Sequence, residues 1–86
     1  MSDLVEIFEG RRPHLLAIAY GMLGSVSDAE DVVQDAFLRW RRVPVRHVDS
    51  PRRYLERIVT RLCIDQLRAL KRRREEYVGV WLPEPS

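Results

Sequence analysis

The sequence predicts an all-α protein, a compact bundle of three to four helices. Apolar residues recur at spacings of three and four, and no stretch alternates between apolar and polar residues as a half-buried strand would. With 86 residues the chain can form at most one domain around one modest core. We expect the helical domain over residues 1–76 and a linker or tail over residues 77–86.

The first helix is expected to begin after Ser2, a candidate N-cap, with Asp3 in its first turn. Its apolar positions are Leu4, Ile7, Phe8, Leu15, Ala19 and Met22. Pro13 predicts a bend or an interruption near residues 10–12, because proline has no amide hydrogen to donate. Gly24 stands where a helix-ending glycine is typical.

The second helix is the clearest element of the sequence. Ser27 and Glu30 form a capping-box pattern at the start of an apolar stripe. The stripe consists of Ala29, Val32, Val33, Ala36, Phe37 and Trp40, and its two aromatic residues are expected in the core. Pro44 is expected to end this helix, and residues 43–51 are expected to form a loop between two prolines.

The third helix is predicted to open with Ser50 as N-cap and Pro51 at the first helical position, and to run to about Arg74. Its apolar arc contains Leu55, Ile58, Val59, Leu62, Ala69 and Leu70. Glycine and prolines in residues 77–86 predict a linker or an extended docking strand there, and Trp81 is expected to dock onto a partner surface.

Charge is strongly segregated along the chain. Residues 1–38 carry seven acidic and two basic side chains, a net charge of −5, whereas residues 39–74 carry thirteen basic and three acidic ones, a net charge of +10. Fourteen of the fifteen basic residues are arginine, whose planar guanidinium suits phosphate binding, although a GC-rich genome would produce the same excess. A chain with this dipole can hold a polyanion at one end and a basic partner at the other.

Six basic residues of the third helix fall within one arc of about 100° on a helical wheel, opposite the apolar arc. They are Arg53, Arg57, Arg61, Arg68, Lys71 and Arg72. A solvated helix face would explain this stripe, but the adjoining Arg39, Arg41, Arg42, Arg46 and Arg52 favour binding to a nucleic acid backbone. Tyr54, at the edge of the arc, either stacks on an unpaired base or covers the rim of the core.

The polar side of the second helix contains an apolar residue. Asp31, Gln34, Asp35 and Leu38 lie opposite the apolar stripe. An exposed leucine surrounded by polar residues on a rigid helix is typical of the middle of a protein–protein patch, although single exposed leucines are also common in monomers.

Several other function classes find no support in the sequence. There is no nucleophile motif and no glycine-rich phosphate loop, and His14 and His47 are far apart, so we expect neither an enzyme nor a cofactor. Cys63 is the single cysteine, which excludes an internal disulfide and a cysteine-built metal site, and it is expected in the core. No apolar run reaches the roughly 20 residues of a membrane span, so no membrane contact is expected.

Three segments resemble parts of a bacterial RNA polymerase sigma factor of the extracytoplasmic-function (ECF) group. Residues 28–40, with the sequence DAEDVVQDAFLRW, resemble region 2.2; residues 54–68 resemble regions 2.3–2.4, and residues 12–20 resemble region 2.1. The match covers residues 4–74 with the blocks in order. Residues 77–85 further resemble the linker of a subgroup whose full-length members carry a C-terminal SnoaL-like domain.

The resemblance implies a sigma domain 2 with two binding surfaces, located in the bacterial cytoplasm. The second helix would dock on the clamp helices of the polymerase β′ subunit through Asp31, Gln34, Asp35 and Leu38. The loop and the start of the third helix would bind the non-template strand of the minus-ten promoter element, capture a flipped base and help to melt the duplex. The residues implied are Arg46, His47, Asp49, Ser50, Arg53, Tyr54, Arg57 and Arg61.

The sequence departs from the group's pattern in two respects. It lacks domain 4, which binds the minus-thirty-five element, so this chain alone is not expected to direct full promoter recognition. The loop has no asparagine where such factors often use one, so either His47 or Asp49 takes that role or the pocket differs. An anti-sigma factor is a further candidate partner, and a stand-alone helical nucleic-acid binder and a pure interaction module are the alternatives.

Overall fold

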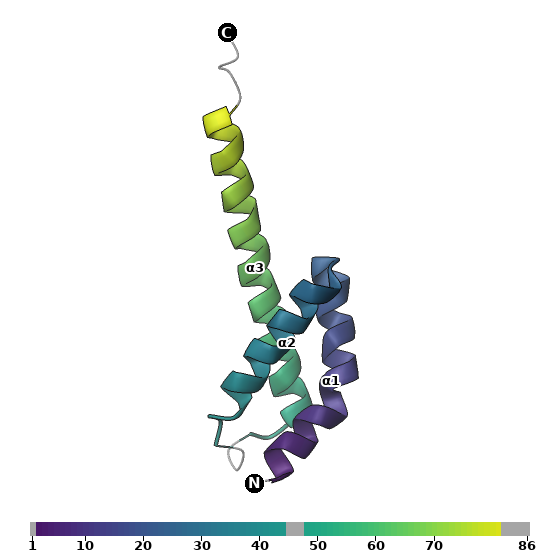
Figure 1. The fold of residues 1–86 in the computed structure, drawn as a ribbon. Helices are drawn as coiled ribbons and strands as arrows, with labels where there is room; N and C mark the ends of the chain where they lie inside the picture. Colours follow the sequence, from purple (N-terminus) through teal and green to yellow (C-terminus); the bar gives the residue numbers. More distant parts are fainter. Residues whose placement is uncertain (1, 45–47, 82–86) are drawn as a thin grey trace.

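The computed structural model describes residues 2–44 and 48–81, with side chains over 3–44 and 48–76. Its three helices are α1 (Ser2–Leu23), α2 (Val26–Trp40) and α3 (Pro51–Trp81), and each helix contacts the other two (Figure 1). The described residues contain no strand, so the predicted all-α bundle is confirmed with three helices. None of these helices combines the length and the apolar character needed to cross a membrane.

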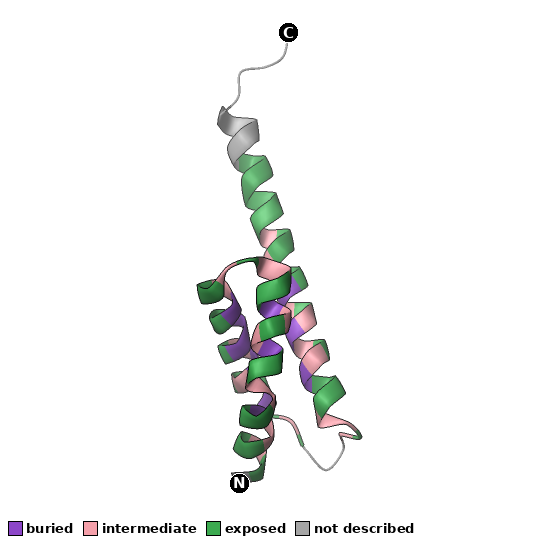
Figure 2. Cartoon of the chain, turned by 90° about the vertical axis from the view of Figure 1, so that its right-hand side faces the viewer, coloured by how far each residue is buried: buried purple, intermediate pink, exposed green. Residues whose placement is uncertain are grey.

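The core lies between the helices, and each helix contributes one face to it (Figure 2). The buried residues are Phe8, Leu15 and Ala19 from α1, Ala29, Val32, Val33, Ala36 and Trp40 from α2, and Leu55, Val59 and Cys63 from α3. Phe37 is half-buried, and its ring meets that of Phe8 edge-on at 5.0 Å between centroids. The core positions predicted for Phe37, Trp40 and Cys63 are therefore confirmed.

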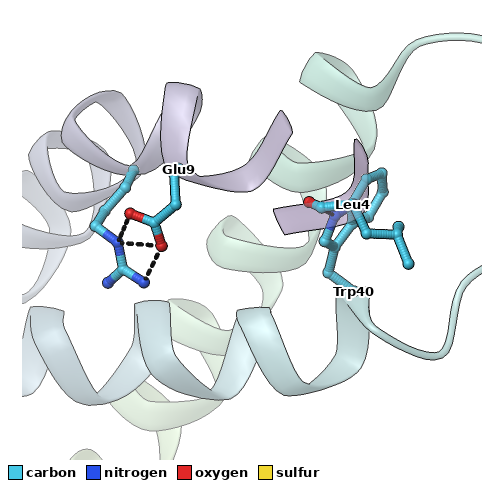
Figure 3. A network of polar contacts seen from close by, with 4 residues as sticks. Leu4, Glu9 and Trp40 are labelled. Atoms are coloured by element: carbon cyan, nitrogen blue, oxygen red, sulfur yellow. Dashed lines mark hydrogen bonds and ion pairs between the residues drawn. The ribbon is translucent and has the colours of Figure 1, made fainter. Parts of the chain in front are cut away.

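Among the described residues, Trp40 is the largest fully buried side chain, and it connects the end of α2 to the start of α1. Its Nε1 donates a hydrogen bond to the carbonyl oxygen of Leu4 at 2.9 Å (Figure 3). A buried indole N–H without a partner would lose the hydrogen bond that water provides, so this contact makes burial of the ring favourable. The same view shows the exposed pair of Glu9 and Arg12 on α1, whose closest atoms are 2.8 Å apart.

Two helix ends are as predicted. Gly24 has a φ of +73°, and its N–H donates to the carbonyl oxygen of Tyr20 at 2.8 Å, which closes α1 with a left-handed glycine. At the start of α3 the hydroxyl of Ser50 accepts a hydrogen bond from the backbone N–H of Arg53 at 3.3 Å, and Pro51 is the first helical residue. The N-terminal turn of α3 is thereby fixed.

The predicted capping box of α2 is wrong by two residues. The N-cap is Ser25, which has extended backbone and whose hydroxyl accepts from the N–H of Asp28 at 3.3 Å. Ser27 and Glu30 lie inside the first turns of the helix. Because Gly24 ends α1 in a left-handed conformation, the chain is already turned at Ser25, and the next helix begins there.

The remaining boundaries depend on packing as well as on local signals. α1 is continuous through Pro13 and bends, which is one of the two outcomes that the proline predicted (Figure 1). The buried residues Phe8 and Leu15, on either side of the proline, hold both halves of α1 against the core. α2 ends at Trp40, ahead of Pro44, with a turn closed by a bond from the N–H of Val43 to the carbonyl oxygen of Trp40 at 3.1 Å.

α3 runs seven residues beyond its predicted end at Arg74, so residues 77–81 are helical and not an extended strand. The division into a domain over residues 1–76 and a linker over residues 77–86 stays a prediction. The 31 residues of α3 span about 46 Å whereas the 22 of α1 span about 33 Å, so the C-terminal part of α3 projects past the bundle (Figures 1 and 2). Leu70, predicted on the apolar arc, is consequently 39% exposed. No glycine or proline stands between Pro51 and Gly79, and a nucleated helix propagates without one. The rest of the predicted tail, residues 82–86, and the side chain of Trp81 lie outside the described part of the chain.

Candidate nucleic-acid interface

The N-terminal half of α3 carries two adjoining hollows in its surface. The helix hollow is lined by Arg53, Glu56, Arg57, Thr60, Arg61 and Ile64. The loop hollow is lined by Val48, Asp49, Ser50, Arg53, Tyr54 and Arg57. Because Arg53 and Arg57 line both, the hollows form neighbouring parts of one surface. Residues three and four apart lie together on a helix, which explains why the arginines converge there.

Six of the eight residues predicted to bind DNA meet on this surface. They are Asp49, Ser50, Arg53, Tyr54, Arg57 and Arg61. Arg46 and His47 lie outside the described residues. The hydroxyl of Ser50 caps α3 by accepting from the N–H of Arg53, so Ser50 shapes the floor of the loop hollow as well as lining it.

Arg53, Arg57 and Arg61 supply the positive charge of the helix hollow. All three are exposed, and none forms an ion pair with another described residue. The basic surface continues along the projecting part of α3, where Arg68 and residues 71–74 are exposed as well. The predicted basic stripe is therefore solvent-facing, in two parts on one helix: Arg53, Arg57 and Arg61 near its start, and Arg68, Lys71 and Arg72 farther along, with exposed Ile64 between them.

The position of Tyr54 is geometrically compatible with both roles that the sequence left open, covering the core and stacking on a base. Its ring centroid lies 5.9 Å from that of Trp40, in a tilted arrangement, so it covers the rim of the core. Its side chain remains 38% exposed and lines the loop hollow. An aromatic ring supported by the core and open to solvent provides a platform on which an unpaired base can stack.

Glu56 is a residue of this surface that the sequence analysis missed. Its Oε2 lies 2.8 Å from Nε2 of His14 on α1, and Nε of Arg52 donates to the same oxygen at 3.4 Å. The hydrogen bond with His14 is the main reason why the pKa of Glu56 lies below its ordinary value, and Arg52 lowers it further. The spacing of Arg52 and Glu56 signals their pairing in the sequence, but nothing in the sequence signals the contact with His14.

The second candidate surface lies on α2. We call Asp31, Gln34, Asp35 and Leu38 the acidic face; they stand at helical spacings on the side of α2 opposite its buried residues. Leu38 is 47% exposed, so the predicted exposure of this leucine is confirmed. Asp35 pairs with Arg39 at 3.5 Å, while Asp31 and Gln34 are exposed. The acidic face thus consists of one apolar side chain, that of Leu38, with hydrogen-bonding groups and negatively charged carboxylates around it.

The remaining titratable residues offer little chemistry. Burial raises the pKa of the Cys63 thiol, which keeps it protonated and unreactive inside the core. Over the described ranges, no cluster of three or more histidine, cysteine, aspartate or glutamate side chains could hold a metal ion.

Comparison with known proteins identifies the family. The model of Sigma-70 region 2 matches residues 7–73. The chain is 49% identical over 81 residues to the ECF RNA polymerase sigma factor SigJ of Mycobacterium tuberculosis, covering 94% of this chain and 26% of SigJ. It is 38% identical to the probable ECF sigma factor SigI of the same species, over 86% of this chain and 26% of SigI. It is 37% identical to SigW of Bacillus subtilis, over 81% of this chain and 37% of SigW.

The chain thus spans about a quarter to a third of the length of these relatives. No solved structure gives a significant match. The resemblance to domain 2 of an ECF sigma factor, inferred from the motifs of α2 and α3, is confirmed, while the narrower resemblance to the subgroup with a SnoaL-like domain stays a prediction. This chain belongs to the Sigma-70 region 2 family, and its relatives are ECF sigma factors.

Proposed function

We propose that this chain is the domain of a sigma factor that joins core RNA polymerase to the opened minus-ten element during transcription initiation. The observation that supports this best is the coexistence of two uncovered surfaces of opposite chemistry on one small bundle, the acidic face of α2 and the arginine-lined hollows of α3. The membership of a family of transcription factors argues against an enzyme.

The acidic face would bind the clamp helices of the polymerase β′ subunit, with Leu38 as its apolar anchor. Full burial of a leucine side chain is worth about 1.5–3 kcal/mol, and about half of that remains to be gained at Leu38. An aspartate at this position would lose that gain and bury an unpaired charge, at a further cost of about 2 kcal/mol. Together these effects weaken the complex by a factor of roughly 100.

The test measures the affinity of a β′ clamp-helix fragment for the chain and for Leu38→Asp. Val26→Asp is the matched control, because Val26 is 61% exposed and begins the same helix, where an aspartate is favourable. We expect Leu38→Asp to weaken binding by a factor of roughly 100 and Val26→Asp to leave it unchanged. Equal affinities of the wild type and Leu38→Asp, or no binding by the wild type, would refute the proposed polymerase contact.

The α3 surface would hold single-stranded promoter DNA, with phosphates on Arg53, Arg57 and Arg61 and a flipped base against Tyr54 in the loop hollow. Base stacking on an aromatic side chain contributes about 1–3 kcal/mol. This offsets the few kcal/mol that unstacking a base requires. Arg46, His47 and Asp49 belong to the proposed base-binding loop, and the proposed ligand is the non-template strand.

The DNA contact is tested with single strands selected by the chain from a random pool. We expect a recurring sequence that binds more tightly than its scrambled version, and Arg57→Ala should flatten the salt dependence by about 0.7 in logarithmic slope. Arg12→Ala is the control, because Arg12 lies on α1 and pairs with Glu9. Equal binding of selected and scrambled strands would refute base recognition. DNA binding without β′ binding would favour a stand-alone nucleic-acid binder.

Two further partners stay predictions that depend on the longer protein. An anti-sigma factor with an acidic surface would compete with DNA for α3, and a SnoaL-like domain would follow the chain in the subgroup it resembles. Full promoter recognition would require a domain 4 in addition to this chain.

A further inference from the structure

One carboxylate, that of Glu56, lines the helix hollow together with three arginines. Among the six residues that line the helix hollow, three are arginines and only Glu56 is acidic. It is three residues from Arg53 along α3, so the two side chains are neighbours on the helix surface. A neutral residue in place of Glu56 would increase the affinity of this surface for phosphates. The negative charge of Glu56 is therefore unfavourable for phosphate binding alone, which indicates another role.

Glu56 is held in place from two helices. Oε2 accepts from Nε of Arg52, one turn earlier on α3, and contacts Nε2 of His14 on α1 at 2.8 Å. An unanchored glutamate on a helix surface samples several rotamers and its charge is blurred over several ångströms. Because both partners bind the same oxygen, the charge of Glu56 has a defined position, and the guanidinium of Arg52 is drawn toward it.

We propose that Glu56 is a specificity-determining residue of the DNA-binding surface, which excludes phosphates from one part of the hollow and so weakens sequence-independent binding. The inference rests on the proposed DNA-binding function. Specificity is a difference between two affinities, and a repulsive element that penalises the wrong ligand increases it. Helical spacing puts Arg57 and Arg61 on the side of the helix hollow away from Glu56. A strand bound with its base in the loop hollow can place its backbone along these two arginines, whereas a strand lying over the opposite side of the helix hollow meets Glu56.

The size of the effect follows from the charge. A phosphate about 6 Å from the carboxylate of Glu56 is repelled by its negative charge. If the effective dielectric constant lies between that of bulk water and that of a partly solvated surface, this repulsion lowers the affinity of the protein for the strand about three- to ten-fold. Neutralising Glu56 also frees Arg52 from its ion pair. One additional phosphate contact by that arginine would steepen the logarithmic salt slope for single strands by about 0.7.

The experiment compares the wild type with Glu56→Gln in titrations of fluorescein-labelled oligothymidine over a series of NaCl concentrations. Glu9→Gln is the matched control, since it removes one carboxylate that is paired with an arginine at short range but lies on α1, outside the hollow. We expect Glu56→Gln to bind oligothymidine about three- to ten-fold more tightly with a steeper salt slope, and Glu9→Gln to change affinity less than about two-fold.

A purely structural role for Glu56 predicts the opposite sign, because losing the contact between α1 and α3 would loosen the site and weaken binding. Glu56→Asp separates the two roles: it keeps the charge but shortens the reach to His14, and we expect it to bind as weakly as the wild type. Equal or weaker binding by folded Glu56→Gln, with normal binding by the wild type, would overturn this inference alone. Absence of binding by both proteins would overturn the DNA-binding function as well.

Discussion

Replacing Trp40 by phenylalanine tests whether the contact between α2 and α1 stabilises the whole bundle. Trp40 is fully buried, and its Nε1 donates to the carbonyl oxygen of Leu4 at 2.9 Å. Phenylalanine keeps an aromatic ring in the core but cannot make this hydrogen bond, and it leaves part of the space of the outer, six-membered ring of the indole unfilled. The substitution therefore removes two stabilising contributions without introducing a buried polar group.

The expected loss can be worked out from these two contributions. The hydrogen bond contributes about 1 kcal/mol net to the free energy of unfolding. Complete truncation of a buried tryptophan costs about 3–5 kcal/mol, so loss of roughly a third of the ring system costs about 1–2 kcal/mol. The sum of about 2–3 kcal/mol is a large part of the stability of so small a domain. Each 1 kcal/mol lowers Tm by about 4–8 °C at this size, so Tm should fall by about 10–20 °C.

Thermal unfolding followed by far-ultraviolet circular dichroism measures the change, with Leu38→Ala as the control. Leu38 lies two residues earlier on the same helix but is 47% exposed, and alanine favours a helix at least as well. Leu38→Ala should change stability by less than about 0.5 kcal/mol. A Tm for Trp40→Phe within about 2 °C of the wild type would refute the assignment of Trp40 to the core. An equal loss of stability in Trp40→Phe and Leu38→Ala would refute the assignment of Leu38 to the exposed acidic face.

Three further predictions follow from local contacts. Ser25→Ala should destabilise the protein by about 1 kcal/mol in urea unfolding, because Ser25 caps α2, whereas Ser27→Ala should cost little; equal losses would contradict the cap. The pKa of Glu56 in the folded protein lies below its ordinary value of 4.5, mainly because of the hydrogen bond with His14. This hydrogen bond therefore stabilises the fold at pH values above 4.5, and the stabilisation is lost as the pH falls through the pKa that Glu56 has in the folded protein. His14→Ala should therefore make the acid-induced loss of stability shallower, and an unchanged pH profile would argue against this contact. Because burial raises the pKa of the Cys63 thiol, a disulfide reagent should label the native protein far more slowly than the urea-unfolded protein, and equal rates would show that the thiol is accessible.

Helical periodicity was sufficient to predict the parts of the fold in which local and tertiary preferences agree. The stripe from Ala29 to Trp40 repeats at three and four residues, and its members are buried or half-buried in the structure. Leu38 interrupts the polar side of the same helix, so its exposure could be inferred from the helical wheel alone. Gly24 and Ser50 act through bonds within a few residues of themselves, which a sequence can reveal.

The sequence could not reveal features that depend on contacts distant along the chain. His14 and Glu56 are 42 residues apart, and their contact exists only because α1 packs against α3. Pro13 predicts either a bend or an interruption, and only the burial of Phe8 and Leu15 on either side of it decides for a continuous helix. The apolar arc of α3 predicted burial of Leu70, which lies beyond the ends of its neighbours. Helical spacing shows which side of a helix is apolar, but it does not show how far the partner helices reach.

The position of Trp40 explains how so small a bundle can keep the two proposed binding surfaces in a fixed relation. Its indole N–H is bonded to α1, and its ring lies beside Tyr54, which lines the loop hollow of α3. On the same last turns of α2, Leu38 points away from the core into the acidic face. One core residue therefore supports the platform proposed for a DNA base while its helix presents the anchor proposed for the polymerase. Because closely packed interiors deform little, a polymerase bound at Leu38 would hold Tyr54 at a set place relative to the DNA strand.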